Sequence, residues 1–291
     1  MRLNFETPAD VWLKLEALQP VGSFKLRGAL NALRKADRED LAGGVVTASA
    51  GNMAQGVAWA ARELGIPCTV VVPDHAPATK LAAVRRLGGR IIPVPFERWW
   101  QAIEESRFEG EPGLFVHPVQ DEAVIAGNGT IGLEIVDDLP EVDVVLVPFG
   151  GGGLVTGIGS AVKALRPQAR VVAVEPETAA PLAASLTAGS PRAIEYRPSF
   201  VDGAGGRGVL PAMWSRIRDL VDAALAVSLD ETAEAVRTVA ERNRVVAEGA
   251  GALPVAAALR GLHEGTVVCV VSGGNIDAAK LATILSGETP G

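Results

Sequence analysis

The chain has 291 residues, 48% of them apolar, and a formal net charge of −7. This length suits one large domain or two closely packed domains with a substantial core. An acidic chain without a basic cluster is not expected to bind nucleic acid, and no apolar run approaches the roughly 18 residues that span a bilayer, so a membrane is not an expected partner either.

The cysteines and histidines bear on the compartment and on metal binding. Cys68 and Cys269 each lie inside an apolar, strand-like run, which is typical of buried thiols in a cytosolic protein. His75, His117 and His263 are scattered along the chain, and we interpret them as structural or surface residues. The N-terminus also lacks the apolar core of a signal peptide. We therefore expect a cytoplasmic protein without a bound metal.

Short β-branched runs alternate with helical patterns along most of the chain. Strands are expected at residues 11–15, 45–48, 68–72, 91–94, 142–147, 171–174 and 266–271. Helices are expected at residues 26–35, from after 48 to about 64, and at 79–87, 129–136, 153–164, 232–241 and 250–262. This alternation, with glycines ending several helices, predicts an α/β fold with parallel strands covered by helices on both faces. Residues 96–113 and 188–208 are interpreted as connections or mobile segments.

The run Gln19-Pro-Val-Gly-Ser-Phe-Lys-Leu-Arg-Gly28 joins the first expected strand to the first expected helix. Gly22 suits a tight turn, and we expect Ser23 to be the helix N-cap. Lys25 then lies at the positive end of a helix dipole, which favours the neutral amine that a Schiff-base lysine needs. Taken alone, however, this stretch is better interpreted as a helix start with a solvated lysine.

Four consecutive glycines, Gly150 to Gly153, follow the expected strand 142–147 and precede a helix. Glycine leaves the backbone N–H groups unshielded, and at a helix N-terminus such groups form a nest for an anion. The run is neither a P-loop nor the spaced glycine motif of dinucleotide folds. It predicts a phosphate site, with a flexible turn as the alternative.

Three other strand ends or helix starts carry polar groups. In the loop Thr47-Ala-Ser-Ala-Gly-Asn-Met53, the backbone and Ser49 could hold a carboxylate, and Asn52 could bond to a phenolic oxygen. Ser272 follows the last strand and could bond to a neutral ring nitrogen. Glu248 begins a glycine-rich helix. For each of them an ordinary turn or an N-terminal helix acid is the alternative.

Five motifs in one order give the chain a family resemblance. They are Pro20-Val-Gly-Ser-Phe-Lys-Leu-Arg-Gly-Ala29, Ala48-Ser-Ala-Gly-Asn52, Ile125-Ala-Gly-Asn-Gly-Thr-Ile-Gly-Leu-Glu134, the four glycines, and Val271-Ser-Gly-Gly-Asn275. Over nearly its whole length the chain resembles the fold type II pyridoxal-phosphate enzymes, in the threonine/serine dehydratase and serine racemase branch. The resemblance implies two open, mostly parallel twisted sheets with flanking helices, as in the tryptophan synthase β-subunit, with pyridoxal 5′-phosphate in the cleft between domains. It divides the chain into a large cofactor domain, residues 1–43 and 121–291, and a small inserted domain, residues 44–120.

The resemblance also implies roles for individual residues. Lys25 would be the catalytic lysine that binds the cofactor covalently, beside Phe24. Asn52 would bond to the 3′-oxygen of the ring and Ser272 to its nitrogen, while Glu248 would lie near the cofactor. The backbone groups implied to bind the phosphate are those of Gly150, Gly151, Gly152, Gly153 and Leu154. The loop implied to receive the substrate carboxylate consists of Ser49, Ala50, Gly51, Asn52 and Met53.

The activity implied is dehydration and deamination of a small 3-hydroxy amino acid. L-Threonine would give 2-oxobutanoate and ammonia, and L-serine would give pyruvate and ammonia. Serine racemases carry a serine, their second acid/base, where this chain has Ala50, so we favour a dehydratase. A racemase, a β-replacement synthase and a non-catalytic binding protein of the same fold remain as alternatives. The small amino-acid substrate is the expected partner, and relatives are commonly homodimers or homotetramers.

Several positions depart from the family pattern. Met53 replaces the usual histidine and Asn128 the usual glutamine, which affects the substrate side more than the cofactor. Some relatives bind a divalent cation through positions equivalent to Glu175, Ala179 and a second acid, but here the second acid is Pro181, so no metal is predicted. The chain stops soon after Ser272–Asn275, so a C-terminal regulatory domain is not expected.

Overall fold

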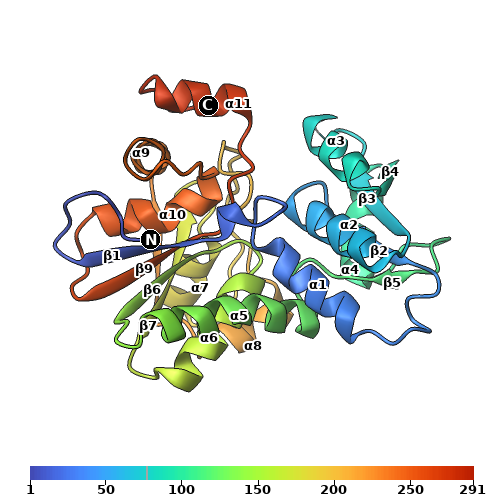
Figure 1. Cartoon of the computed structure of the whole chain (residues 1–291), viewed down its shortest axis with the longest axis horizontal. Coiled ribbons are helices and arrows are strands. Elements are labelled where there is room, and N and C mark those ends of the chain that lie inside the picture. The colour runs from blue at the N-terminus through green and yellow to red at the C-terminus, as the bar shows by residue number, and fades with distance from the viewer. Residues whose placement is uncertain (77) are drawn as a thin grey trace. The chain divides into compact units, whose positions relative to one another are not determined.

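The computed structural model describes residues 1–76 and 78–291, which form two compact units. Unit 1 comprises Met1–Leu18 and Gly129–Gly291, and unit 2 comprises Gln19–Asn128. Figure 1 labels their helices and strands. The boundaries of these units differ from those of the predicted domains. Helix α1 (Lys25–Lys35), which was assigned to the large domain, packs against helix α2 (Asn52–Leu64) and so belongs to unit 2.

Unit 1 is built on a five-stranded sheet in which every neighbouring pair is parallel. Its three inner strands are apolar along most of their length, as expected for a parallel sheet that is covered on both faces. In spatial order the strands are β1 (Asp10–Leu15), β9 (Thr266–Val271), β6 (Val144–Pro148), β7 (Arg170–Pro176) and β8 (Ala223–Val227).

Helices cover both faces of this sheet. Helix α10 packs along β9, β6, β7 and β8, whereas α6 packs on β6 and β7. Figure 1 shows α9 and α10 on one side of the strands, with α6 and α8 on the other. The helices of unit 1 are α6 (Gly153–Leu165), α7 (Pro181–Ala188), α8 (Pro211–Ile217), α9 (Leu229–Thr238), α10 (Gly249–Leu259) and α11 (Ala278–Leu285), and a π-helical turn, Val239–Asn243, extends α9.

Unit 2 has a four-stranded parallel sheet of its own. Val70 and Val72 point toward the core that α1 and α2 complete, and Val71 points to the opposite core beneath α4, because successive side chains alternate across a strand. In spatial order the strands are β4 (Arg90–Val94), β3 (Cys68–Pro73), β2 (Val45–Ala48) and β5 (Leu114–Phe115). The remaining helices are α3 (Ala78–Arg86), α4 (Phe96–Glu105) and α5 (Glu122–Asp138), the last of which runs on into unit 1.

These two parallel sheets with flanking helices confirm the predicted fold class. One predicted connection is wrong, because residues 96–105 form α4. Trp99, Ala102 and Ile103 have the i, i+3, i+4 spacing of one helix face, and that face packs against the sheet. Phe96 and Trp100 remain exposed on the helix. The mixture of tryptophans and charged residues in this segment is therefore the pattern of an amphipathic helix.

Both cysteines are buried and free, as predicted. Cys68 lies in β3 of unit 2, where burial raises the pKa of its thiol to about 12. Cys269 lies in β9 of unit 1, where burial also raises the thiol pKa. Across the described residues no helix is both long enough and apolar enough to cross a membrane.

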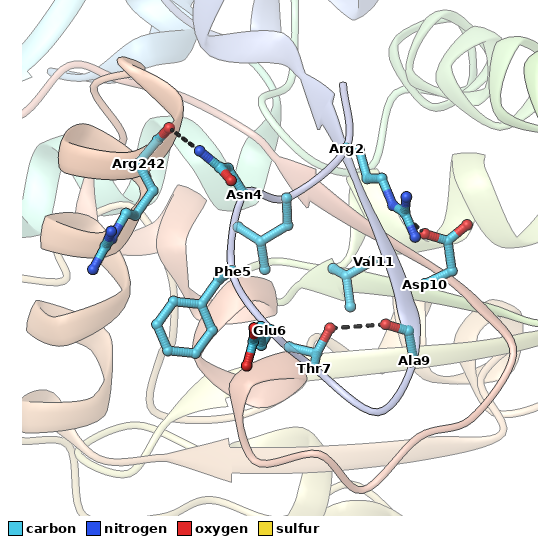
Figure 2. A pocket seen from close by; sticks show the side chains of 10 residues that line it. Arg2, Asn4, Phe5, Glu6, Thr7, Ala9, Asp10, Val11 and Arg242 are labelled. Atoms are coloured by element: carbon cyan, nitrogen blue, oxygen red, sulfur yellow. Dashed lines mark hydrogen bonds and ion pairs between the residues drawn. The ribbon is translucent and has the colours of Figure 1, made fainter.

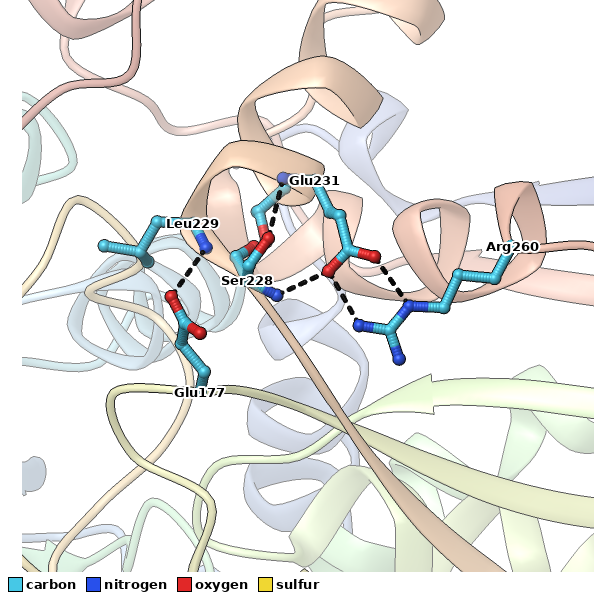
Figure 3. A network of polar contacts seen from close by, with 6 residues as sticks. Glu177, Ser228, Leu229, Glu231 and Arg260 are labelled. Carbon is cyan, nitrogen blue, oxygen red and sulfur yellow. Dashed lines mark hydrogen bonds and ion pairs between the residues drawn. The ribbon is translucent and has the colours of Figure 1, made fainter.

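A polar network fixes the start of α9 (Figure 3). Ser228 and Glu231 form a capping box, in which each side chain accepts a hydrogen bond from the backbone of the other. Glu231 also accepts two hydrogen bonds of 2.7 Å from Arg260, the C-cap residue of α10. The paired guanidinium lowers the pKa of the Glu231 carboxyl to about 2. Leu229 adds a backbone N–H bond of 3.4 Å to Glu177.

A pocket of 910 Å³ lies at the N-terminal end of unit 1. It is lined by residues between Arg2 and Val11 together with Arg242, as Figure 2 shows. Asn4 donates a hydrogen bond to the carbonyl of Arg242, so the N-terminal loop is tied to the turn after α9. None of the residues predicted to bind the cofactor lines this pocket.

Candidate active site

The four-glycine run forms the turn between β6 and α6. Gly152 has φ +97°, a backbone conformation that favours glycine. A Cβ added at Gly152 would lie 2.5 Å from Cδ1 of Ile217, so the space beside the backbone is also closed to a side chain. The turn leads directly into α6, whose first residue is Gly153. Bare N–H groups therefore lie at the positive end of a 13-residue helix.

A second glycine-rich loop contacts this turn. The N–H of Gly205 donates to the carbonyl of Phe149 at 2.9 Å, and a Cβ on Gly150 would lie 3.5 Å from Cα of Ala204. On its other side, a Cβ on Gly203 would lie 3.3 Å from Oε1 of Glu248. Sequence reasoning missed this loop because it lies in the segment interpreted as a connection. Its glycines, which admit close backbone approach, were the available signal.

The start of α10 at Glu248 contacts the segment that follows Ser272, within unit 1. Glu248 is the N-cap residue of α10, and its N–H donates to the carbonyl of Gly273 at 2.9 Å. A Cβ on Gly251 would lie 2.5 Å from that same carbonyl oxygen, so α10 begins in tight contact with the chain that leaves β9. The side chains of Glu248 and Ser272 are 6% and 3% exposed. Unit 1 thus links the glycine turn, Glu248 and the Ser272 segment through neighbouring contacts.

Lys25 is the first residue of α1 in unit 2 and is half-buried. Its Nζ donates a hydrogen bond of 3.1 Å to the carbonyl of Pro118 and lies 5.2 Å from the centre of the Phe24 ring. The turn before the helix is as predicted, with Gly22 at φ +67°. The predicted cap is wrong: Phe24 occupies the N-cap position, and the buried hydroxyl of Ser23 has no hydrogen-bond partner among the described residues.

The Ser49–Met53 loop joins β2 to α2. Asn52 begins α2, and one turn later a Cβ on Gly56 would lie 3.0 Å from the carbonyl carbon of Lys25. The starts of α1 and α2 are therefore in contact. Ser49 accepts a hydrogen bond of 3.3 Å from the N–H of Gly51, which fixes the loop. The side chain of Met53 is 2% exposed and belongs to the core of unit 2, so only its backbone is suited to contact a ligand.

The donor groups fit a phosphate. Unshielded N–H groups at a helix N-terminus bind a dianion without any basic side chain. Thr156, in the first turn of α6, has a buried hydroxyl with no hydrogen-bond partner in the described parts of the chain. An orphaned hydroxyl beside such a turn is consistent with a ligand that supplies oxygen acceptors. The residues that are present therefore suit a phosphorylated cofactor.

Glu175, which matches a cation-ligand position of some relatives, is fully buried and serves a structural role. Its two carboxylate oxygens accept hydrogen bonds of 2.8 Å from the N–H groups of Leu182 and Ala183, in the first turn of α7. Burial raises the pKa of Glu175 to about 7, and the two N–H bonds oppose that rise. Within residues 1–76 and 78–291, no group of three or more His, Cys, Asp or Glu is placed to hold a metal ion.

Comparison with known proteins identifies the family. The family model described as pyridoxal-phosphate dependent enzyme matches residues 2–273. The chain belongs to the pyridoxal-phosphate dependent enzymes. The resemblance inferred from the five motifs is thereby confirmed, as is the prediction of pyridoxal phosphate as cofactor.

Named relatives of this pyridoxal-phosphate dependent enzyme include lyases and racemases. The L-threonine ammonia-lyase of Thermotoga maritima is 43% identical, over 98% of this chain and 72% of the relative. The processed form of threonine deaminase isoform 2 from Solanum lycopersicum is 34% identical with a TM-score of 0.88, over 96% of this chain and 78% of that one. Maize serine racemase is also 34% identical, with a TM-score of 0.84 over 96% and 87%.

Proposed function

We propose that this enzyme is a lyase that converts L-threonine to 2-oxobutanoate and ammonia, and L-serine to pyruvate and ammonia. The observation that carries the proposal is the 43% identity to an L-threonine ammonia-lyase over 98% of the chain. The local geometry supports it, because Lys25 begins a helix and the glycine turn begins another, as the family motifs require. In the net reaction the substrate loses its 3-hydroxyl as water, and hydrolysis then consumes one water and releases ammonia.

In this proposal the residues of the family motifs hold the cofactor. The N–H groups of Gly150–Gly153 and Leu154 hold the phosphate, and Ser272 bonds to the ring nitrogen. Asn52 bonds to the 3′-oxygen, and Lys25 is the point of covalent attachment. Pyridoxal phosphate, when bound, supplies the electron sink for a carbanion at the α-carbon of the substrate. A serine at the ring nitrogen leaves that nitrogen neutral, which favours prompt loss of the 3-hydroxyl.

The residues of the chain then bind the substrate and move its proton. The Nζ atom of Lys25 takes the α-proton as general base. The Ser49–Met53 loop holds the substrate carboxylate with its backbone N–H groups, and the bond between Ser49 and Gly51 keeps that loop in one conformation. The proposed role of Glu248 is to lie beside the cofactor as a carboxylate that contacts the Gly203 loop.

A serine-type racemase is the second candidate, since maize serine racemase is among the structural neighbours. Racemisation needs a second proton donor on the substrate face opposite Lys25. At the position where serine racemases carry that group, this chain has Ala50, whose methyl group cannot donate a proton. We therefore favour the lyase. A non-catalytic binding protein would retain the cofactor but turn over none of these substrates.

The first experiment measures release of 2-oxo acid and ammonia from L-threonine, L-serine and their D-isomers, together with the visible spectrum of the protein. A lyase gives stoichiometric 2-oxo acid and ammonia, and Lys25→Ala loses both the product and the visible absorption band. Recovery of inverted amino acid with little 2-oxo acid would refute the lyase in favour of the racemase. Bound cofactor without any turnover would refute both.

Two broader expectations belong to the same proposal. The enzyme acts as a homodimer or homotetramer in the cytoplasm, by analogy with relatives and from the buried thiols. Light scattering during size-exclusion chromatography tests the first expectation, where a monomer would contradict it. Cell fractionation with an antibody tests the second, where recovery outside the cytoplasmic fraction would contradict it.

A further inference from the structure

His117 lies next in sequence to the residue that accepts the hydrogen bond of Lys25, and its ring is 5% exposed. The Nδ1 atom accepts two backbone hydrogen bonds, from Val119 at 3.0 Å and from Gln120 at 2.9 Å. Both donors lie in the turn that starts at Pro118. The imidazole therefore shapes this turn from within, in the way that an Asx side chain closes a turn.

This arrangement needs a neutral ring with its proton on Nε2. A proton on Nδ1 would point at two N–H donors and would leave both of them without an acceptor. Burial lowers the pKa of His117, and the charge of Lys25 lowers it further. The carboxylate of Asp121 and a hydrogen bond with the backbone of Ile103 oppose that shift without cancelling it. The ring thus stays an acceptor at neutral pH.

The segment around the turn is anchored at both ends. Before the turn, the hydroxyl of Thr47 donates to the carbonyl of Val116 at 2.9 Å, which joins the segment to β2. After the turn, the carboxylate of Asp121 accepts two N–H groups at the start of α5. Between these anchors His117 organises the backbone whose Pro118 carbonyl receives Nζ of Lys25 at 3.1 Å.

We propose that His117 is a positioning residue, whose neutral Nδ1 fixes the turn that holds the Lys25 amine through the carbonyl of Pro118. This inference rests on the proposed role of Lys25 as the cofactor lysine. If the turn were loosened, the amine of Lys25 could adopt other positions. Displacement of a reacting group by about 1 Å can cost as much as 10²-fold in rate. Folding and phosphate binding by the glycine turn of unit 1 would be little affected.

The test uses two substitutions that separate the acceptor from the imidazole. His117→Asn places a carbonyl oxygen near the position of Nδ1, whereas His117→Gln carries its oxygen one bond further, toward the position of Nε2. His263→Asn, at a buried histidine of unit 1, is the matched control. The full-length protein is stripped of cofactor, mixed with pyridoxal phosphate and reduced with borohydride at timed intervals, and mass spectrometry follows the modification of Lys25. Values of kcat and KM for L-threonine are measured on the reloaded enzymes.

We expect His117→Gln to slow modification of Lys25 and to lower kcat, each by about tenfold or more, with KM changed less than about threefold. His117→Asn should recover most of both losses, and His263→Asn should match the wild type. Wild-type rates in His117→Gln, or equal losses in the Asn and Gln variants, would overturn the positioning role. If His117→Gln fails to fold, Pro118→Ala, which keeps the carbonyl but frees the turn, must slow modification in the same way. This labelling assay needs no catalytic turnover. If the Lys25→Ala protein takes up the reduced cofactor at another lysine as fast as the wild type takes it up, the proposal that Lys25 is the cofactor lysine itself fails.

Discussion

Glu175 should make the stability of unit 1 depend on pH. Burial raises the pKa of its carboxyl in the folded protein to about 7, from 4.5 in the unfolded chain. The folded state therefore binds the proton more tightly than the unfolded state does. This contribution to stability is complete below pH 4.5, and it is lost as the pH rises through 7. This shift corresponds to at most roughly 3 kcal/mol in the free energy of unfolding.

Glu175→Gln stays neutral at every pH and therefore lacks this contribution. Its absolute stability also changes, because glutamine offers one oxygen to two backbone donors, Leu182 and Ala183, at a cost of about 1–3 kcal/mol that does not vary with pH. The informative quantity is the difference in unfolding free energy between wild type and variant, measured by urea denaturation between pH 4.5 and 8. The wild type should lose up to roughly 3 kcal/mol relative to the variant as the pH rises across this range.

The control is Glu177→Gln, which removes an exposed carboxyl two residues along the chain. If stability curves for wild type and Glu175→Gln run parallel across the whole pH range, the carboxyl titrates alike in both states, and the reasoning from burial fails. A difference with the opposite sign would mean that the bonds to the first turn of α7 outweigh burial and hold the carboxylate charged.

Two other substitutions test the glycine turn and the capping network. Gly152→Ala should destabilise the protein by at least about 1–2 kcal/mol through the positive φ alone and should weaken binding of pyridoxal phosphate. Ile217→Ala leaves a cavity with a cost of its own, but in that background Gly152→Ala should lose only the part due to φ, as thermal unfolding and cofactor titration would show. Arg260→Met should cost about 1 kcal/mol, since the pair with Glu231 is partly exposed, and molar salt should reduce that cost in urea denaturation. A Gly152→Ala protein of wild-type stability, or an Arg260→Met loss that ignores salt, would contradict these expectations.

Elements that are buried on both faces were predictable because composition alone marks them. The strands at Val45–Ala48 and Thr266–Val271 have the predicted bounds, since every central position is apolar or β-branched and a glycine or proline lies close by. Helix α10 begins within one residue of its predicted start at Ala250. The glycine turn was predictable for a different reason: four consecutive glycines between a strand and a helix are compatible with few structures other than a tight turn.

Short elements and local partners were not predictable. Helix α7 begins at Pro181, and its first turn is stabilised by Glu175 on the neighbouring strand, which no periodicity within α7 reveals. The expected cap at Ser23 failed because the backbone turns helical at Phe24, out of reach of the hydroxyl. His117 was interpreted as a structural or surface residue because the histidines form no ligand-spaced motif, and its place in the turn depends on the backbone N–H groups of Val119 and Gln120. Each miss depends on tertiary or backbone geometry that side-chain patterns do not encode.

Each unit contains one buried thiol, so the reactivity of that thiol can report how often its unit opens. Cys68 and Cys269 can be alkylated only when the surrounding sheet opens, since both are buried and both have raised pKa values. Labelling rates resolved by peptide mass would therefore measure the opening free energy of each unit separately in the native protein. A ligand that stabilises one unit should slow labelling at the cysteine of that unit, so the two labelling rates report the stabilisation of each unit separately.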